Sequence, residues 1–432
     1  MPGAVSPYRI LCLDGGGRWS LISVMALQKL FGERARGYDI LANFDLVAAN
    51  SGGSLVLGAL AENMALDHLL TLFSTSELLF PRESFFSLDH LYHWVTRWLL
   101  GVGPKYNTKK KLTGLLELLP VMGTVKLTEV PGRIQKSNGQ LTHFLIAGFD
   151  YDWMKARYLR SNADSLANFT GPTEATLAEA IHASSTAPVN YFNAPARLPG
   201  DVTSGNRFWD GAVAGDNNPV LAAVTEALAN GQGLVAHSDI RVLSLGTGSV
   251  SLPVVAGRPG KDYGLAGTAA CPGLFHDLRE LAGSILDDPP DSATFEAWVM
   301  LGNPVPPTPT GTLLAKDLSQ RAEPVSLVRM NPLVRPVRDG AGNWQPPQGL
   351  KRKEFVKLTN IGIDARVPQD VTLIVKFAQA WLDDNVPNQP VREDPYTFEP
   401  RIGYTRFSEA VEAWKARKSR DLEQRRKAAE SS

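Results

Sequence analysis

Apolar residues in the first 250 positions gather in short runs that alternate with stretches of helical spacing. The run Tyr8–Leu13 is short and almost continuously apolar, as in a strand that is buried on both faces. In Leu21–Phe31 the apolar residues recur at intervals of three and four, which predicts a helix. Strands and helices that alternate in this way predict an α/β fold with a mostly parallel sheet and helices on its faces.

The same patterns predict the other elements. We expect strands at Phe44–Ala49, Leu141–Phe149 and Ile240–Leu245. We expect helices at Ser54–Asn63, Leu177–Ser184, Pro219–Asn230 and Thr372–Trp381, and a charged helical tail at Ser408–Arg426. Two segments rich in Gly and Pro are expected to be loops, Gly302–Thr312 and Asp339–Gly349.

Three glycines follow the first strand, in Asp14-Gly15-Gly16-Gly17. Without a Cβ, this backbone can approach a ligand closely and turn several N–H groups toward one point. Such a point binds an anion, which is either a phosphate or the oxyanion of an acyl-transfer transition state.

Ser51 lies in Ala49-Asn50-Ser51-Gly52-Gly53, between a predicted strand and a predicted helix. The small-x-Ser-x-Gly spacing is that of a nucleophile elbow, in which a tight turn exposes the serine Oγ. Ala49 takes the place of the usual first glycine. A serine that only caps a helix is the alternative.

A serine nucleophile needs a base, and Asp210 is the candidate. It ends the apolar run Phe208-Trp209 and precedes Gly211, so it can project into a cleft from the end of a strand. An aspartate in an ordinary turn before glycine is the alternative. Shortly afterwards, Asn217-Asn218-Pro219 is typical of a helix start.

In their order and spacing these segments resemble the patatin-like phospholipases. Further matching segments are Ala183-Ser184-Ser185-Thr186-Ala187-Pro188, Leu243-Ser244-Leu245-Gly246-Thr247-Gly248 and Val328-Arg329-Met330-Asn331-Pro332. The resemblance implies a three-layer α/β/α patatin-like fold with a mostly parallel central sheet and an irregular, partly helical C-terminal region. We expect the acyl hydrolase domain at 1–335, with core motifs at 8–250, and a C-terminal extension at 336–432.

The resemblance also implies a chemistry. Ser51 would be the nucleophile, and Asp210 would accept its proton directly, without a histidine. The chain would be a serine hydrolase that cleaves acyl esters of lipids through a covalent acyl-enzyme, with no metal or other cofactor and no need for calcium. The implied oxyanion hole consists of the amides of Gly15, Gly16, Gly17 and Gly52.

The glycine run departs from the family pattern. Arg18 comes one place early and the bulky Trp19 follows it. Either Trp19 narrows the entrance for the acyl chain or the local loop is shifted.

A hydrolase that stays silent until a partner or small molecule binds is the alternative function. A scaffold protein whose catalytic site has decayed is a third hypothesis.

A Ser–His–Asp triad is the main alternative mechanism. The order serine, acid, histidine leaves His237 and His276 as candidates, because only these follow Asp210. An α/β-hydrolase has several strands before its elbow, whereas only two are predicted before Ser51. His182 is expected to be a helix residue near the site. No G-x-x-x-x-G-K-[ST] phosphate loop occurs in the chain.

Composition limits the class of protein. Lys plus Arg and Asp plus Glu both number 44, a balance that argues against a nucleic-acid partner. The two cysteines, Cys12 and Cys271, predict a reducing compartment rather than a disulfide scaffold. The first strand begins near Tyr8, which leaves no room for a cleaved leader, and no apolar run is long enough to span a bilayer. We expect a cytoplasmic protein that meets membranes or micelles transiently; secretion without a cleaved leader is also compatible.

Aromatic and apolar residues are dense in Phe85–Val102. This segment is interpreted as a buried helix, or as a membrane-interface segment or lid over an acyl pocket. Basic residues follow it and would either meet anionic headgroups or form a solvated face: Lys105, Lys109, Lys110 and Lys111. The basic tail Lys415–Lys427 is interpreted as a solvated helix end.

Overall fold

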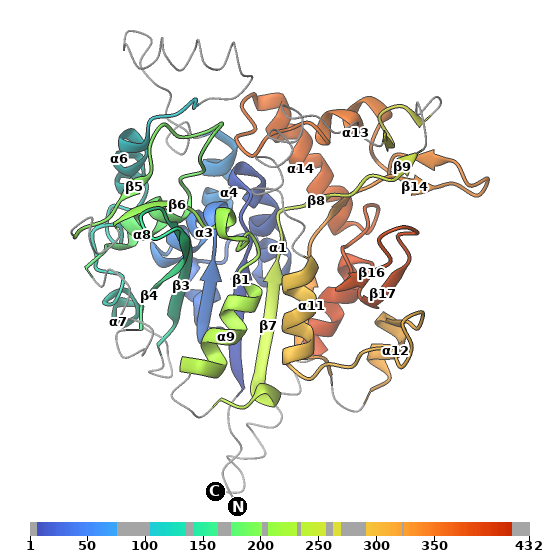
Figure 1. The fold of residues 1–432 in the computed structure, drawn as a ribbon, viewed down its shortest axis with the longest axis horizontal. Coiled ribbons are helices and arrows are strands. Elements are labelled where there is room, and N and C mark those ends of the chain that lie inside the picture. The colour runs from blue at the N-terminus through green and yellow to red at the C-terminus, as the bar shows by residue number, and fades with distance from the viewer. Residues whose placement is uncertain are drawn as a thin grey trace, which may run out of the picture.

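The computed structural model describes residues 7–75, 104–134, 141–162, 174–200, 206–230, 235–255, 262–268, 291–321 and 324–416. A central sheet is built from β1 (Tyr8–Leu13), β2 (Leu46–Ala49), β3 (His143–Asp150), β4 (Lys155–Arg160), β5 (Ala196–Arg197), β6 (Arg207–Asp210), β7 (Ile240–Leu245) and β12 (Leu327–Met330). The eight strands lie in the order β12-β7-β1-β2-β3-β6-β5, with β4 also paired to β3 (Figure 1). This is the mostly parallel sheet that the sequence predicts.

Strands β12, β7, β1, β2 and β3 run parallel, whereas β4, β5 and β6 run antiparallel to their neighbours. The carboxyl ends of the parallel strands therefore meet at one edge of the sheet. Leu13, the last residue of β1, pairs with Ala49 at the end of β2 and with Leu245 at the end of β7. The loops that carry Gly15 and Ser51 consequently start side by side, at the edge where α/β sheets bind ligands.

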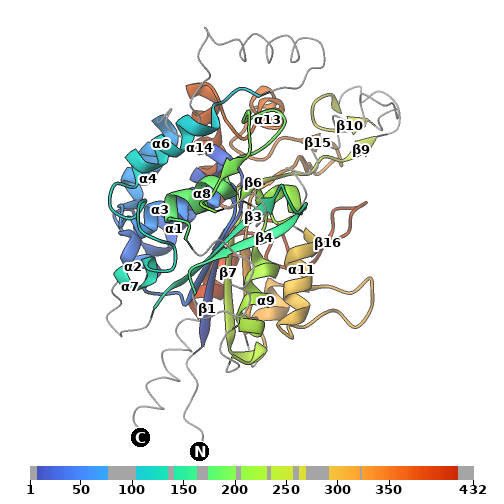
Figure 2. The same ribbon diagram turned by 60° about the vertical axis from the view of Figure 1, so that its left-hand side comes forward.

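Helices cover both faces of the sheet, as Figure 2 shows, and this confirms the three-layer α/β/α fold. One face carries α1 (Leu21–Phe31), α2 (Gly37–Leu41), α3 (Ser51–Ala61), α4 (Leu66–Thr75), α6 (Thr108–Leu118), α8 (Leu177–Ser184) and α14 (Pro368–Leu382). The other carries α9 (Val220–Asn230) and α11 (Asp291–Met300). Short helices elsewhere are α7 (Val130–Arg133), α12 (Ala315–Ser319) and α13 (Arg352–Leu358).

The other described strands are short and form small sheets apart from the central one. They are β8 (Ser249–Val250), β9 (Val254–Val255), β10 (Gly267–Thr268), β11 (Leu313–Leu314), β13 (Leu333–Val334), β14 (Val337–Arg338), β15 (Trp344–Gln345), β16 (Arg392–Glu393) and β17 (Pro400–Gly403). The interpretation of Asp339–Gly349 as loop alone was wrong, because β15 lies within it and pairs with β14 across a tight turn.

The C-terminal region packs directly on the sheet and its helices. A single hydrophobic cluster includes Ile10 in β1 and Trp414 near the end of the described chain. Trp414 stacks on Phe44 with 6.1 Å between ring centroids. The Asn388 side chain accepts a hydrogen bond from the backbone N–H of Asn331 at 2.9 Å. The predicted domain boundary at residue 335 stays a prediction, and the core is continuous across it.

Several predicted elements have their predicted bounds, among them Leu21–Phe31 and Ile240–Leu245. The helix expected at Ser54–Asn63 starts earlier, at Ser51. The predicted lid or interface segment Phe85–Val102, Cys271 and His276 lie outside the described residues, as does the basic tail beyond residue 416. Within the residues that the structure describes, no helix is long and apolar enough to cross a bilayer.

Candidate active site

Ser51 lies at the sharp turn from β2 into α3, with a positive φ of 48°. A non-glycine residue in this conformation is typical of the strained nucleophile elbow. The N-cap of α3 is Asn50 rather than Ser51, so the alternative of a capping serine was wrong. The Ser184 hydroxyl accepts a hydrogen bond from the Ser51 N–H at 3.0 Å and donates to Asn50 Oδ1 at 3.3 Å.

Asp210 ends β6 and is only 1% exposed. The Ser51 side chain lies close enough to this carboxylate to lower its pKa. The carboxylate accepts hydrogen bonds from Asn50 Nδ2 at 3.2 Å and from the Ala212 N–H at 3.0 Å. The structure thus brings together the two side chains that the sequence analysis singled out 159 positions apart in the chain. Asn50 and Ser184, which sequence reasoning did not assign to the site, hold this pair in place.

Burial sets the electrostatics of Asp210. Removal from water raises its pKa, while the hydrogen bonds from Ser51, Ala212 and Asn50 and the charge of Lys111 lower it. A carboxylate whose pKa is raised in this way is a stronger base than an exposed aspartate, so it is suited to accept a proton from a serine hydroxyl.

The glycine loop is held close to the elbow. A Cβ built on Gly52 would lie 2.7 Å from the Gly17 nitrogen and 2.2 Å from Ser20 Oγ, so only glycine allows this approach. Gly17 has a positive φ of 55°. In the described part of the chain, the amides of Gly16, Gly17 and Gly52 have no recorded acceptor. They are therefore available to an oxyanion.

The Gly15 amide differs from the other three amides that the sequence analysis assigned to the oxyanion hole. It donates a hydrogen bond to the Asn217 carbonyl oxygen at 2.9 Å, so the expectation that it binds the oxyanion was wrong for this structure. A Cβ on Gly15 would clash with Asn217 Oδ1, and it would also lie 2.9 Å from Asn50 Nδ2 and 3.0 Å from Ser51 Cβ. The need for glycine at this position therefore arises from close packing against the elbow rather than from a free donor.

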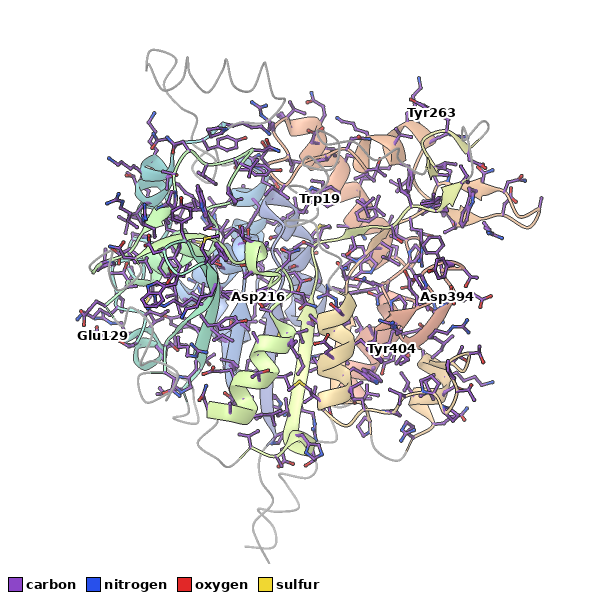
Figure 3. The ribbon with its side chains drawn as sticks, in the orientation of Figure 1. Trp19, Glu129, Asp216, Tyr263, Asp394 and Tyr404 are labelled. Atoms are coloured by element: carbon purple, nitrogen blue, oxygen red, sulfur yellow. The ribbon has the colours of Figure 1, made fainter. Side chains whose placement is uncertain are left out.

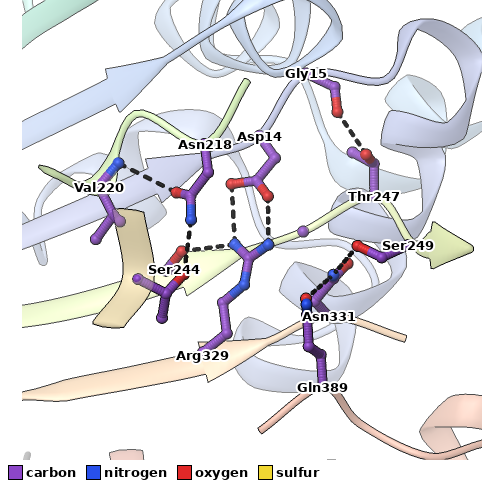
Figure 4. Close-up of polar contacts among 12 residues, drawn as sticks. Asp14, Gly15, Asn218, Val220, Ser244, Thr247, Ser249, Arg329, Asn331 and Gln389 are labelled. Atoms are coloured by element: carbon purple, nitrogen blue, oxygen red, sulfur yellow. Dashed lines mark hydrogen bonds and ion pairs between the residues drawn. The ribbon is translucent and has the colours of Figure 1, made fainter. Parts of the chain in front are cut away.

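Figure 4 shows the polar contacts that hold the glycine loop against β7 and β12. Arg329 on β12 donates from Nη1 to Asp14 Oδ1 at 3.0 Å and from Nη2 to Asp14 Oδ2 at 2.5 Å. Arg329 Nη1 also donates to Ser244 Oγ at 2.8 Å, and Thr247 Oγ1 donates to the Gly15 carbonyl oxygen at 2.5 Å. Burial raises the pKa of Asp14, and the guanidinium opposes that rise. Contacts from β7 and β12 thereby hold the backbone of the glycine loop, which follows β1, in place.

A cleft of about 330 Å³ opens beside the glycine loop. Its lining comes from the glycine loop, from the segment after β7 and from the C-terminal region. The lining residues are Asp14, Gly15, Gly16, Trp19, Tyr191, Asn217, Thr247, Gly248, Ser249, Val250, Val334, Thr359, Ile361, Gly362 and Ile363. Trp19, labelled in Figure 3, forms part of this lining. It packs edge-to-face against Phe377 of α14, with 6.2 Å between ring centroids.

Segment 359–366 of the C-terminal region lies directly against the glycine loop. The Arg18 N–H donates to the Ile363 carbonyl oxygen at 2.8 Å. The neighbouring Asp364 accepts a hydrogen bond from Tyr106 Oη at 2.6 Å and lies 3.6 Å from Lys105 Nζ. The departure at Arg18 and Trp19 thus lies where the glycine loop meets a segment from the other end of the sequence.

Lys111 is the residue of the site that sequence reasoning placed wrongly. It was grouped with neighbouring lysines as a solvated or headgroup-binding face, and Lys109 and Lys110 are indeed exposed. Lys111, by contrast, is 2% exposed and donates to Thr186 Oγ1 at 3.3 Å. Burial lowers its pKa to about 7, and the charge of Asp210 opposes that fall. No local sequence signal separates it from the adjacent lysines.

The described histidines do not support a triad, and His276 lies outside the residues that the structure describes. His237 precedes the amino end of β7, whereas Ser51 follows the carboxyl end of the parallel strand β2. The length of β7, about 20 Å for six residues, separates the two edges. His182 lies on α8, and burial together with Lys111 lowers its pKa to about 3. Among the described residues, no group of three or more His, Cys, Asp or Glu side chains is arranged to hold a metal ion.

Comparisons with known proteins bear on this geometry. Residues 11–224 match the family model of the patatin-like phospholipases. No curated protein matches the chain. The crystal structure of VipD from Legionella pneumophila aligns with 88% of this chain and 68% of its own, at 10% identity and a TM-score of 0.34. Members of this family are hydrolases of the esterase or lipase type. On the strength of this match, the chain carries a patatin-like phospholipase domain over residues 11–224.

Proposed function

We propose that this chain hydrolyses acyl esters of lipids through Ser51 and Asp210. The observation that carries the proposal is the placement of Ser51 and Asp210 beside each other at the end of the sheet. A serine in a strained elbow contacts a buried carboxylate beside backbone amides that have no recorded acceptor in the described residues. A nucleophile, a base and oxyanion donors at one point are the parts that acyl transfer requires.

The reaction would proceed in two halves. Ser51 Oγ attacks the ester carbonyl carbon while its proton passes to Asp210, and the amides of Gly16, Gly17 and Gly52 bind the oxyanion. The C–O bond to the alcohol then breaks, and the alcohol leaves with the proton from Asp210. In the second half, water attacks the acyl-enzyme, Asp210 accepts a proton from the water, and the Ser51 hydroxyl is restored as the fatty acid leaves.

The cleft beside the glycine loop supports an ester substrate with an acyl chain. Its volume of about 330 Å³ is at the lower end of the range for small-molecule sites. Val250, Val334 and Ile361 contribute apolar surface to its walls. The mechanism needs no metal, so we propose that hydrolysis is independent of calcium.

The test measures fatty acid release by the purified full chain from p-nitrophenyl butyrate and from phosphatidylcholine vesicles, in the presence of EDTA. Ser51→Ala is expected to lower turnover at least about 10³-fold. Ser319→Ala, which changes an exposed serine on α12, is the matched control and should keep full activity. Undiminished turnover in Ser51→Ala contradicts the mechanism.

Labelling with a fluorophosphonate separates this function from the alternative of a silent, regulated hydrolase. The proposed enzyme should both label at Ser51 and turn over ester without any addition. A chain that labels at Ser51 but hydrolyses neither substrate would instead support a site that awaits a partner. A chain that does neither would support a decayed scaffold.

A further inference from the structure

Lys111 is a buried charged residue at the site that the two-residue mechanism does not use. It lies in the first turn of α6, whose start is fixed by Asn107, the N-cap that accepts a hydrogen bond from the Lys110 N–H at 3.0 Å. The Lys111 ammonium lies 4.4 Å from the centre of the Phe192 ring. A lysine is rarely buried to this extent unless its charge has a partner.

Thr186 connects Lys111 to the base. Its hydroxyl accepts the hydrogen bond from Lys111 Nζ at 3.3 Å, and its carbonyl oxygen accepts one from the Asp210 N–H at 2.9 Å. The same hydroxyl donates to the His182 carbonyl oxygen at 2.6 Å, which fixes its rotation. One residue therefore sets the position of the ammonium relative to the end of β6.

The charges around Asp210 are few. Four described groups lower its pKa: Ser51, Ala212 and Asn50 are neutral hydrogen-bond donors, and Lys111 carries a charge. His182 faces Lys111 from α8, but its pKa of about 3 leaves it uncharged at neutral pH. A carboxylate that is fully removed from water tends to take up a proton unless a cation compensates its charge.

We propose that Lys111 is a positioning residue whose ammonium keeps the buried Asp210 carboxylate ionised, so that Asp210 is free to accept the proton of Ser51. This inference rests on the proposed hydrolase function. A protonated Asp210 has no capacity to act as the base. Lys111 itself transfers no proton: the Ser51 proton passes to Asp210 and on to the leaving alcohol.

The decisive variant is Lys111→Met, which keeps the length of the side chain and removes its charge. The rate of fluorophosphonate labelling and the kinetics of p-nitrophenyl butyrate hydrolysis are measured from pH 5 to 9 on the full chain. Loss of an opposite charge should move the acid limb of the profile up by about 1–3 pH units. At pH 6 kcat should therefore fall by at least about tenfold, with KM within about twofold. At pH values above both acid limbs the rates of the two proteins should converge.

Lys110→Met is the matched control, because it removes the same charge from an exposed neighbour on the same helix, and its pH profile should equal that of the unaltered chain. Thr186→Val is the second variant. It leaves the carbonyl that binds Asp210 in place but removes the hydroxyl that holds Lys111, so it should move the acid limb in the same direction by a smaller amount. If Lys111→Met does not fold, the acid limb of the Thr186→Val profile tests the role of Lys111 instead.

A folded Lys111→Met protein with an unchanged acid limb overturns the proposal and leaves Lys111 as a packing residue. If Lys111→Met does not fold, an unchanged acid limb in Thr186→Val overturns it. Failure of the hydrolase function itself gives a different result, since ester turnover would then persist in Ser51→Ala or be absent from the unaltered chain.

Discussion

Arg329 and Asp14 form a buried, two-pronged ion pair although 315 positions separate them in the chain. Both side chains are nearly inaccessible, at 2% and 3%. The pair joins β12 to the loop after β1 across the intervening strand β7. The glycine loop is therefore anchored by the late part of the sequence as well as by its own strand.

Arg329→Met should destabilise the protein strongly. The change leaves the Asp14 carboxylate buried without its partner, and breaking a buried pair in this way costs about 3–5 kcal/mol of unfolding free energy. Urea unfolding measures the loss. Arg406→Met, which breaks an exposed pair with Glu409, is the control and should cost less than about 1 kcal/mol. Equal losses in the two variants contradict the anchoring role.

Gly52→Ala should damage catalysis. The added methyl would lie 2.7 Å from the Gly17 nitrogen and displace the two amides that we propose to bind the oxyanion. Loss of one oxyanion donor lowers kcat by about 10²–10³-fold, with a smaller effect on KM. Steady-state kinetics with p-nitrophenyl butyrate measure both constants. Gly132→Ala is the control, because its methyl meets no atom within 4 Å, and it should keep kcat.

Val250→Trp should shift the preference for acyl-chain length. Val250 is 52% exposed and lines the cleft, so an indole at this position reduces the volume open to a long chain. We expect kcat/KM for p-nitrophenyl palmitate to fall about tenfold or more relative to the butyrate ester, a change of about 1.4 kcal/mol. Val254→Trp introduces the same side chain outside the cleft and should leave the ratio unchanged. If both variants lower the ratio equally, this cleft does not hold the acyl chain.

Asp216 should make stability depend on pH. Burial raises its pKa to about 6, although Tyr158 Oη donates to its two oxygens at 3.0 and 2.9 Å (Figure 3 labels Asp216). Its pKa in the unfolded chain is about 3.9, so the folded state binds the proton more tightly. This tighter binding contributes up to about 3 kcal/mol to the free energy of unfolding. The contribution is fully present below about pH 4 and is lost as the pH rises through 6.

Urea unfolding of Asp216→Asn at pH 4 and pH 7 tests this expectation. The drop in unfolding free energy between the two pH values should be smaller in the variant than in the unaltered chain. Glu117→Gln, at an exposed position on α6, should show the same drop as the unaltered chain. A drop that is identical in Asp216→Asn would show that Asp216 does not titrate in this range.

The sequence predicts well those parts of the site that follow directly from a strand end. β2 is apolar throughout and β1 is apolar apart from Arg9, and both loops that follow them are rich in glycine. The loop at Gly15 and the elbow at Ser51 are therefore local features. Asp210 was found in the same way, at the end of an apolar run. In these places the residue type and its immediate neighbours already restrict the backbone.

Features that depend on distant packing could not be predicted. Whether Lys111 or Lys110 is buried depends on the rotation of α6 against α8, and all three lysines in that run have the same local pattern. The hydrogen bond that occupies the Gly15 amide likewise depends on Asn217, which lies 202 positions away in the chain. Cross-chain hydrogen bonds and desolvation decide these details, and neither leaves a periodic signal in the sequence.

The contact between Arg18 and Ile363 has a consequence for synthesis of the protein on the ribosome. The glycine loop and the elbow emerge early, but segment 359–363, which completes the wall of the cleft, emerges only after more than 300 further residues. A nascent chain that has already formed β1, β2 and α3 still has an open cleft. The order of translation thus delays completion of the cleft until nearly the whole polypeptide has been made.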